Sequence, residues 1–463
     1  QIYYPRGKVL GGSGSINAMV YARGLETDYE NWGASKEWSF ENIKKVYHSM
    51  EQQINNNKDY LIGEKIPVNN VSEHHHPILE YFFNASNEIG IKKNTNLTTS
   101  SQDQVGHYNI NTYRGTRHSS SKVFLKPISK NQRLTILNNT QVKKLIIQDK
   151  KITGIKIQNK SSEKIIKLSQ GAILCSGSIM TPYLLMHSGI GDKEHLKQHN
   201  KEIIIDNSNV GRNLQDHLGL DYLFKTHHHS LNKSLGTWPG RITSFLKYIY
   251  NRSGPLSLSI NQSGGYINWN SKHHYPNLQI YFNPLTYSIT HKNKRPLLKT
   301  DKFNGFIIGY NSCRPKSLGR VTLNSPNPND TPLIDPNFLS HDEDIYDVKC
   351  AINFSKILAS TDNIKKIRKE SVKHDLLNAN EEDMIDHFKS NAVSIYHPCG
   401  TCKMHEDPKK GVVSERLKVH GMENLWIADA SVFPNITSGN INAPVMMLAN
   451  LGSKFIIEDL KKI

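Results

Sequence analysis

The chain has no run of 18 apolar residues, so the sequence predicts no helix that crosses a membrane. It has only five cysteines, and an odd number does not fit a dense disulfide framework. Cys399 and Cys402 form a C-x-x-C, but they follow His397–Pro398 rather than a strand that leads into a helix. Packing in a turn is therefore favoured over dithiol chemistry for this pair.

Acidic residues are scarce: 41 Asp and Glu stand against 58 Lys and Arg, which gives a net charge of +17. A strong positive charge suits a nucleic-acid or acidic-surface binder. The lysines are scattered, however, and the densest run, residues 365–373, is broken by apolar and acidic residues. We therefore expect no nucleic-acid partner.

The remaining composition is that of a globular protein. Hydrophobic residues make up 37% of the 463 residues, enough to bury a core, and this length suggests two domains. Histidine triplets at 74–76 and 227–229 lie in polar stretches without a cysteine or carboxylate at ligand spacing. The sequence therefore predicts solvated loops there and no metal site.

Two glycine-rich turns stand beside apolar runs. The first, PRGKVLGGSGSIN at 5–17, can present backbone N–H groups to an anion, and we expect a short strand before it and a helix from about Ile16. In the second, a buried strand at Ala172–Cys175 leads through a tight turn into a helix with Pro182 in its first turn and Gly189 at its end. Strand, glycine turn and helix in that order are typical of a doubly wound α/β domain.

Other segments predict antiparallel structure. Residues 134–168 contain four short β-like runs, the last three separated by turns at Asp149–Lys151 and Asn159–Glu163. Short strands recur over 223–342, which indicates a second domain with a mostly antiparallel sheet. Amphipathic helices are expected over 36–50, capped by Ser39, and over 343–359. The fold class is α/β, or α+β overall.

The most informative stretch is 391–449. It places His397 in a turn rich in Gly, Cys and Thr, then a buried strand at Leu425–Ala428 that leads to Asp429, and finally Asn442 at the start of an apolar helix. An imidazole that can act as a base, a polar partner and a helix N-terminus are what a redox cofactor site needs.

Several long motifs of the sequence are similar to those of a known protein family. Four of them, in order along the chain, resemble the glucose–methanol–choline (GMC) family of flavin oxidoreductases: PRGKVLGGSGSINAMVYARG (5–24), GAILCSGSIMTPYLLMHSGIG (171–191), NVGRNLQDHLG (209–219) and ADASVFPNITSGNINAPVMM (428–447). Two more are similar to the insect glucose-dehydrogenase-like branch in particular: YRGTRHSSSKVFLKP (113–127) and IYHPCGTCKM (395–404).

The resemblance implies a discontinuous FAD-binding domain, a lid or connecting region and a substrate-binding domain. The expected limits are 1–45, 120–222 and 391–463 for the first, 46–119 for the second and 223–390 for the third. The FAD-binding domain would be of the doubly wound type. Its usual first βαβ unit, which carries G-x-G-x-x-G, has no counterpart here and is expected to be missing.

The resemblance also implies site residues. His397 matches the family's catalytic histidine, and Asn442 matches the polar partner that holds the substrate oxygen. The helix that follows would direct its positive end at the flavin. The expected FAD-binding residues are Gly11, Gly12, Ser13, Asn17, Val142, Asp429, Ala430 and Asn442.

The predicted function is FAD-dependent oxidation of an alcohol or sugar hydroxyl by hydride transfer to flavin N5, with His397 as the base. Oxygen or a quinone would accept the electrons. Two alternatives stay open: a truncated, catalytically impaired member that acts as a non-enzymatic secreted protein, and a hydroxynitrile lyase on the same fold. Frequent Asn-X-Ser/Thr sequons permit secretion, so an extracellular location is expected: Asn70, Asn84, Asn96, Asn138 and Asn232.

Overall fold

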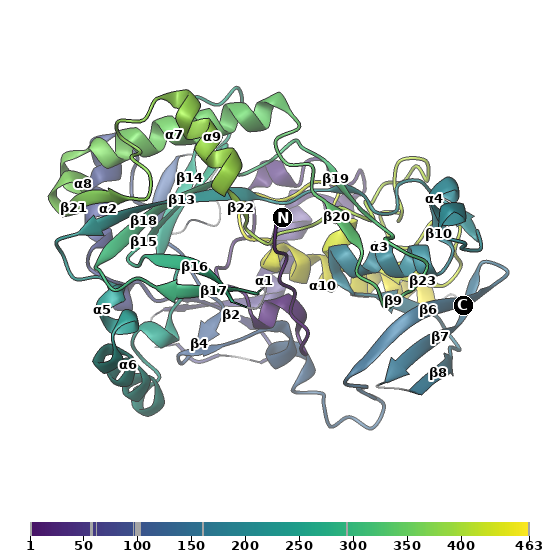
Figure 1. Ribbon diagram of the computed structural model, residues 1–463. Coiled ribbons are helices and arrows are strands. Elements are labelled where there is room, and N and C mark those ends of the chain that lie inside the picture. Colours follow the sequence, from purple (N-terminus) through teal and green to yellow (C-terminus); the bar gives the residue numbers. More distant parts are fainter. Residues whose placement is uncertain are drawn as a thin grey trace.

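The computed structural model describes residues 2–55, 59–61, 63–95, 97, 103–159, 162–292 and 295–461. Figure 1 shows an antiparallel sheet under a layer of helices on the left, and a smaller set of helices and short sheets on the right. Each side has its own large apolar core. This arrangement confirms the mixed α/β fold class.

Antiparallel pairing dominates the larger, seven-stranded sheet, as predicted. Its main path runs β21–β13–β18–β15–β14–β3, and β22 pairs with β13. The strands are β21 (Arg368–Val372), β13 (Leu218–Thr226), β18 (Gly305–Ser312), β15 (Leu278–Asn283), β14 (Ser263–Ile267), β3 (Gln104–His107) and β22 (Val393–Ser394). β3 lies in the segment predicted as a lid or connecting region, and it forms one end of this sheet.

Helices cover one face of this sheet (Figure 1). They are α2 (Leu79–Glu88), α7 (Asp342–Ser360), α8 (Asp362–Ile367) and α9 (Glu381–Asn391). Their apolar side chains share one core with the strands, for example Phe82, Phe282 and Phe354. The helix predicted over 343–359 is thereby confirmed as α7.

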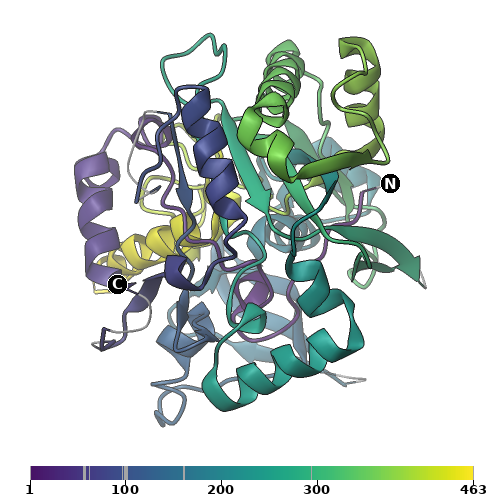
Figure 2. The same ribbon diagram turned by 90° about the vertical axis from the view of Figure 1, so that its left-hand side faces the viewer.

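The second side of the molecule is built around α10 (Asn442–Leu460), seen in yellow in Figure 2. Beside it, β9 (Ala172–Leu174) pairs in parallel with β23 (Leu425–Ile427), and α3 (Gly177–His187) follows β9. α1 (Phe40–Met50) also contacts α10, and Ser39 accepts a hydrogen bond from the N–H of Asn42. The predicted order of strand, turn and helix and the Ser39 cap are both confirmed. The expectation that this strand is buried is wrong, because Ile173 is 49% exposed and only Leu174 of β9 is buried.

The predicted meander is present as β6 (Thr140–Gln148), β7 (Lys151–Asn159) and β8 (Ser162–Lys167). Asp149 and Lys150 adopt left-handed φ angles of 49° and 60°, which suit a two-residue hairpin turn. The expected strand at 134–137 is wrong, since these residues form no strand and pair with no neighbour.

The remaining described elements include two helices that follow one another, α5 (Leu231–Gly236) and α6 (Trp238–Asn251), at the lower left of Figure 1. Smaller sheets are β1–β2 (Glu51–Asn55, Ile66–Asn70), β4–β5 (Thr112–Tyr113, Thr116–Arg117), β10–β11 (Ile190–Gly191, Ile205–Asp206), β12–β19–β20 (Arg212–Leu214, Gly319–Thr322, Leu333–Asp335) and β16–β17 (Tyr287–Lys292, Arg295–Thr300). α4 covers Lys193–Gln198. None of the helices in the described ranges combines the length and the apolar character that a membrane crossing requires.

Two local predictions need correction. No strand precedes the first glycine turn and no helix begins near Ile16; the chain instead makes one 3-10 turn at Gly12–Ser15 and then extends. Arg117 donates hydrogen bonds to the backbone oxygen and side-chain Oδ1 of Asn17, which hold this extended course. Pro182 lies inside α3 rather than in its first turn, because the helix already begins at Gly177.

Candidate functional site

His397 lies in a loop between β22 and the turn at Cys399–Cys402. Its backbone N–H donates to Oδ1 of Asp216 over 2.7 Å, and Ser394 donates to the other oxygen of the same carboxylate. Tyr396, just before it, has a left-handed φ of 67°, which is unfavourable for a residue with a side chain. Its N–H donates to Ser394 Oγ over 2.8 Å, so the surrounding structure supports this strained turn.

The proline inside α3 also helps to place this loop. Pro182 has no N–H, so the carbonyl of Ser178, four residues earlier, lacks its helical partner. That carbonyl accepts a hydrogen bond from Thr401 Oγ1 over 2.6 Å, and Ser178 Oγ donates to the carbonyl of Pro398 over 2.6 Å. These two hydrogen bonds connect α3 to both sides of the turn that follows His397.

The segment after β23 supports the same loop from another direction. The N–H of Gly400 donates to the carbonyl of Ala430 over 3.0 Å, and the N–H of Cys402 donates to that of Ser431 over 2.7 Å. Asp429 accepts from the N–H groups of Ser431 and Gly177, each over 2.8 Å, and from Thr181 Oγ1 over 2.6 Å. Asp429 and Ala430 therefore join β23, α3 and the histidine loop. Cys399 and Cys402 are buried free thiols, in agreement with a packing role.

A chain of hydrogen bonds determines which nitrogen of His397 is basic. His217 precedes β13, Cys313 follows the neighbouring β18, and His217 Nε2 lies 3.0 Å from the Cys313 carbonyl oxygen. A carbonyl only accepts, so His217 carries its proton on Nε2 and its Nδ1 is an acceptor. His217 Nδ1 lies 2.9 Å from His397 Nδ1, which must then be the donor. The lone pair of His397 is therefore on Nε2, 3.1 Å from the amide nitrogen of Asn440.

Burial keeps both rings neutral. It lowers the pKa of His217 to about 4. Burial lowers the pKa of His397 well below its usual range, and the neighbouring His217 and Arg6 act in the same direction. Burial also raises the pKa of the Asp216 carboxyl to about 6, against hydrogen bonds that favour its charged form. At neutral pH His397 is thus a neutral imidazole whose lone pair accepts a hydrogen bond from Asn440.

The first glycine turn meets the start of α10 close to this chain of bonds. Gly11 and Gly12 have φ angles of 87° and 55°, and a Cβ on Gly14 would lie 3.1 Å from Oδ1 of Asn442. Ser13 Oγ accepts from the N–H of Gly7 over 3.2 Å, which closes the turn. A glycine turn and a helix N-terminus distant in sequence therefore lie side by side.

The two asparagines before α10 occupy different places. Asn440 donates toward His397, whereas Asn442 is the first residue of the helix and faces Gly14. The sequence could not separate them, because both fall in the same Gly/Asn turn. The sequence does not single out His217 and Asp216 either; both stand directly before β13. Val142 lies in β6, partly buried against the core, and its contact with a cofactor stays a prediction.

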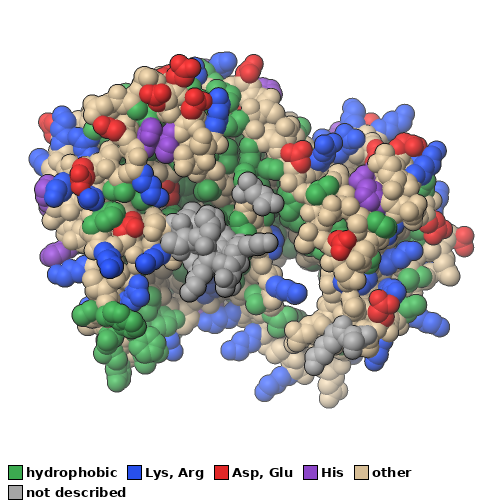
Figure 3. Space-filling view, in the orientation of Figure 1, with side chains coloured by type: hydrophobic (Ala, Val, Ile, Leu, Met, Phe, Trp, Pro, Cys, Tyr) green, Lys and Arg blue, Asp and Glu red, His purple; other side chains and the backbone are tan. Residues whose placement is uncertain are grey.

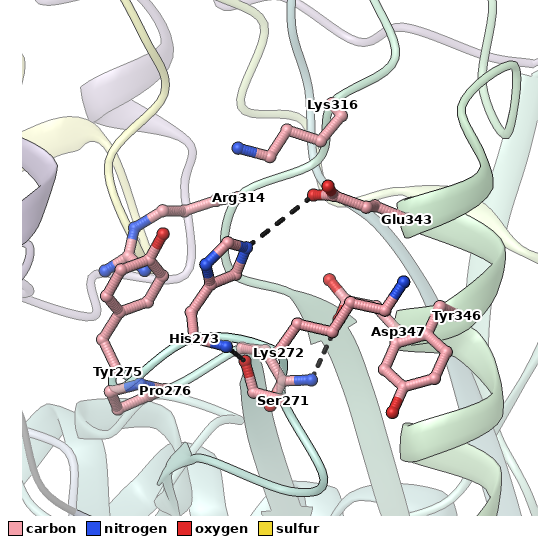
Figure 4. A pocket seen from close by; sticks show the side chains of 11 residues that line it. Ser271, Lys272, His273, Tyr275, Pro276, Arg314, Lys316, Glu343, Tyr346 and Asp347 are labelled. Atoms are coloured by element: carbon pink, nitrogen blue, oxygen red, sulfur yellow. Dashed lines mark hydrogen bonds and ion pairs between the residues drawn. The ribbon is translucent and has the colours of Figure 1, made fainter.

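The small cavity drawn in Figure 4 lies elsewhere. It encloses about 30 Å³ between the turn at 271–277 and α7, and its lining includes Arg314, whose guanidinium stacks over the ring of Tyr275. That volume holds about two water molecules. The cavity is therefore not a candidate for the substrate site. No group of three potential metal ligands occurs among the residues that the structure describes.

Family models described as GMC oxidoreductase match residues 1–219 and 315–449. The chain belongs to the GMC oxidoreductase family. An alcohol dehydrogenase [acceptor] of Pseudomonas putida is 32% identical to this GMC chain, over 98% of the chain and 82% of the relative. An oxygen-dependent choline dehydrogenase of Brucella anthropi is 30% identical over the same shares.

A crystal structure of formate oxidase superposes on this GMC oxidoreductase with a TM-score of 0.89 at 25% identity, over 99% of this chain and 85% of that one. The family confirms the predictions of an oxidoreductase and of FAD as its cofactor.

The geometry fits FAD. α10 begins without a capping side chain and without an acidic residue in its first turn, so its N–H groups can receive a partly negative ring edge. The backbone at Gly12 borders open space, where it can approach a ligand closely.

The buried His217 makes the fold of this GMC oxidoreductase sensitive to mild acid. Its pKa is about 4 in the folded chain against the ordinary 6.5, so between these values the unfolded chain binds more protons there. The free energy of unfolding therefore falls as the pH falls through that window, by up to about 3 kcal/mol. We expect the loss between pH 7 and pH 4 to be smaller by that amount in His217→Gln, measured by urea unfolding.

The comparison removes the titration of His217, while Asp216, whose raised pKa of about 6 acts in the opposite sense, is kept in both proteins. Parallel pH profiles for the wild type and the variant would contradict the prediction.

Proposed function

We propose that this chain oxidises the CH–OH group of an alcohol or sugar with FAD, and that His397 takes the hydroxyl proton. One observation carries the proposal: the hydrogen bonds through His217 leave a neutral His397 with its lone pair on Nε2. An imidazole in this state can accept a proton without first losing one.

The names of the relatives support the reaction class. The Pseudomonas putida relative is an alcohol dehydrogenase and the Brucella anthropi relative a choline dehydrogenase, and both are similar to the chain almost from end to end. A bound FAD would accept the hydride that leaves the substrate carbon.

In the proposed mechanism, the substrate hydroxyl replaces the Asn440 amide as the donor to His397 Nε2, and that amide donates to the substrate oxygen instead. The hydroxyl proton passes to Nε2 as the C–H bond breaks, so the carbon becomes a carbonyl. His397 Nδ1 meanwhile stays hydrogen-bonded to His217, which holds the ring in place. In this proposal Asn440 orients the substrate. The family resemblance predicted that role for Asn442, and for Asn442 it stays a prediction.

The FAD-binding role of the predicted residues is part of this proposal. The turn at Gly11, Gly12 and Ser13, with Asn17 behind it, would hold the cofactor against the start of α10. Asp429 and Ala430 would support it through the loop that they fix. The acceptor (oxygen or a quinone), the extracellular location, the insect branch and the domain limits stay predictions.

A steady-state assay tests the proposed reaction. The FAD-loaded protein is mixed with a primary alcohol, choline or glucose and with an artificial electron acceptor, in air and without oxygen. We expect acceptor reduction with at least one CH–OH substrate, and formation of the matching aldehyde or ketone. A protein with bound flavin that reduces no acceptor with any of them would refute the proposal.

The same assay separates the two alternatives, for which no relative named here gives support. A hydroxynitrile lyase would release cyanide from a hydroxynitrile without reducing an acceptor. A non-enzymatic member would do neither.

A further inference from the structure

α6 presents its apolar face outward, whereas a surface helix normally turns that face to the core. Its outward apolar side chains recur at helical spacing along one stripe: Trp238, Ile242, Phe245, Leu246, Ile249 and Tyr250. Trp238 is 77% exposed and Tyr250 is 79% exposed. In Figure 3 this face is the hydrophobic patch at the lower left, where Figure 1 draws α6.

Small and polar residues on the other side of α6 contact α5 and the residues between the two helices. Ser244 is the buried residue of α6, and its Oγ donates to the carbonyl of Ser234 over 3.3 Å. Thr237 Oγ1 accepts from the N–H of Gly240 over 3.2 Å, and a Cβ on Gly240 would meet the backbone of Lys233 at 2.3 Å. The close approach to α5 requires this side to be small, so the bulky apolar residues must point outward.

The surrounding charge favours one kind of partner. From residue 222 to residue 300 the sequence has ten Lys and Arg and neither Asp nor Glu. Lys233, Arg241, Lys247 and Arg252 of this stretch are exposed on or beside α6. An apolar stripe bordered by basic side chains, with Trp and Tyr at its ends, matches the interface of an anionic bilayer.

We propose that α6 docks this protein onto anionic lipid membranes, with its apolar face in the headgroup region. The helix has 14 residues, which is too short to span a bilayer, so the docking is peripheral. A second copy fits less well, because a two-fold contact would place basic borders against each other.

Sedimentation with lipid vesicles tests the proposal on the full, FAD-loaded chain. We expect binding to phosphatidylcholine vesicles that contain one third phosphatidylserine, and binding about tenfold weaker without the anionic lipid or at high salt. Ile242→Ser/Phe245→Ser/Ile249→Ser should lower binding by about tenfold or more. Lys247→Gln should lower it about fivefold.

A matched control replaces three exposed apolar residues outside α6, as Ile165→Ser/Leu318→Ser/Leu333→Ser, and should bind as the wild type does. Tryptophan fluorescence gives a second readout, because Trp32, Trp38 and Trp426 are buried and Trp238 is the most exposed of the five. We expect a blue shift with anionic vesicles that Trp238→Phe removes while binding is kept.

Three results would overturn the proposal. The first is no binding at low salt by a folded protein, and the second is equal binding by the α6 triple variant. The third is a dimer in light scattering that this variant dissociates, without vesicle binding, which would assign the face to a second copy.

Discussion

Replacement of His397 by alanine is expected to lower kcat for alcohol oxidation by about 10²–10⁴-fold, the usual contribution of a positioned general base. The structure gives the reason: Nε2 is the unprotonated nitrogen of a ring kept neutral by burial. KM should change far less, because the amide of Asn440 can still hold the substrate oxygen. Steady-state kinetics of the FAD-loaded variant with an artificial acceptor measure both constants.

Two controls keep this result interpretable. The flavin absorbance of His397→Ala should match that of the wild type, which shows that the cofactor is retained. His274→Ala removes an exposed histidine outside the site and should keep full activity. A His397→Ala variant whose kcat lies within fivefold of the wild type would exclude the base role.

Asp28→Ala is expected to lower the free energy of unfolding by about 3–5 kcal/mol, because it leaves the largely buried guanidinium of Arg314 unpaired. The Asp28 carboxylate is almost fully buried and accepts from the N–H groups of Leu25 and Ser438, each over 2.7 Å. It also accepts from Ser438 Oγ over 2.8 Å and from Arg314 Nε over 2.7 Å. The measurement is denaturant unfolding of the FAD-loaded protein.

The matched control for this carboxylate is Glu458→Ala. Glu458 pairs with Arg416 at an exposed surface, where such a pair contributes about 0–1 kcal/mol. If Asp28→Ala lowered the free energy of unfolding no more than Glu458→Ala does, the prediction would be wrong, because the Asp28–Arg314 pair would then stabilise the fold no more than an exposed pair.

Much of the fold could be predicted from local patterns. The hairpins at 140–167 and the helix after Ser39 depend on neighbouring residues. The strand–turn–helix at 172–187 also carries its own turn and helix signals, although the partner of its strand, β23, is distant in sequence. The sheet order could not be predicted in this way: β3 joins β14 from a distant segment that was expected to be a lid or connecting region. Pro182 was misplaced because its compensation, the hydroxyl of Thr401, lies 223 residues from Ser178.

The candidate site also contains residues that the sequence predicts and residues that it does not. His397 was predicted because its loop carries a long motif. His217 could not be assigned a role from the sequence, because its role depends on hydrogen bonds to two distant residues. One is His397, 180 residues away, and the other is the carbonyl of Cys313, just after β18. Asn440 and Asn442 are chemically identical and two residues apart, so only the point at which α10 begins separates them.

The chain of hydrogen bonds from the Cys313 carbonyl to Asn440 connects the large sheet with the segment just before α10. His217 enters it from the sheet side, and Asn440 enters it just before the helix at the centre of the second core. A shift of the sheet relative to α10 would change the lengths of these bonds. The position of the proton on His397 therefore depends on how the sheet and α10 are placed relative to each other. NMR chemical shifts of the imidazole nitrogens would detect a change in that placement.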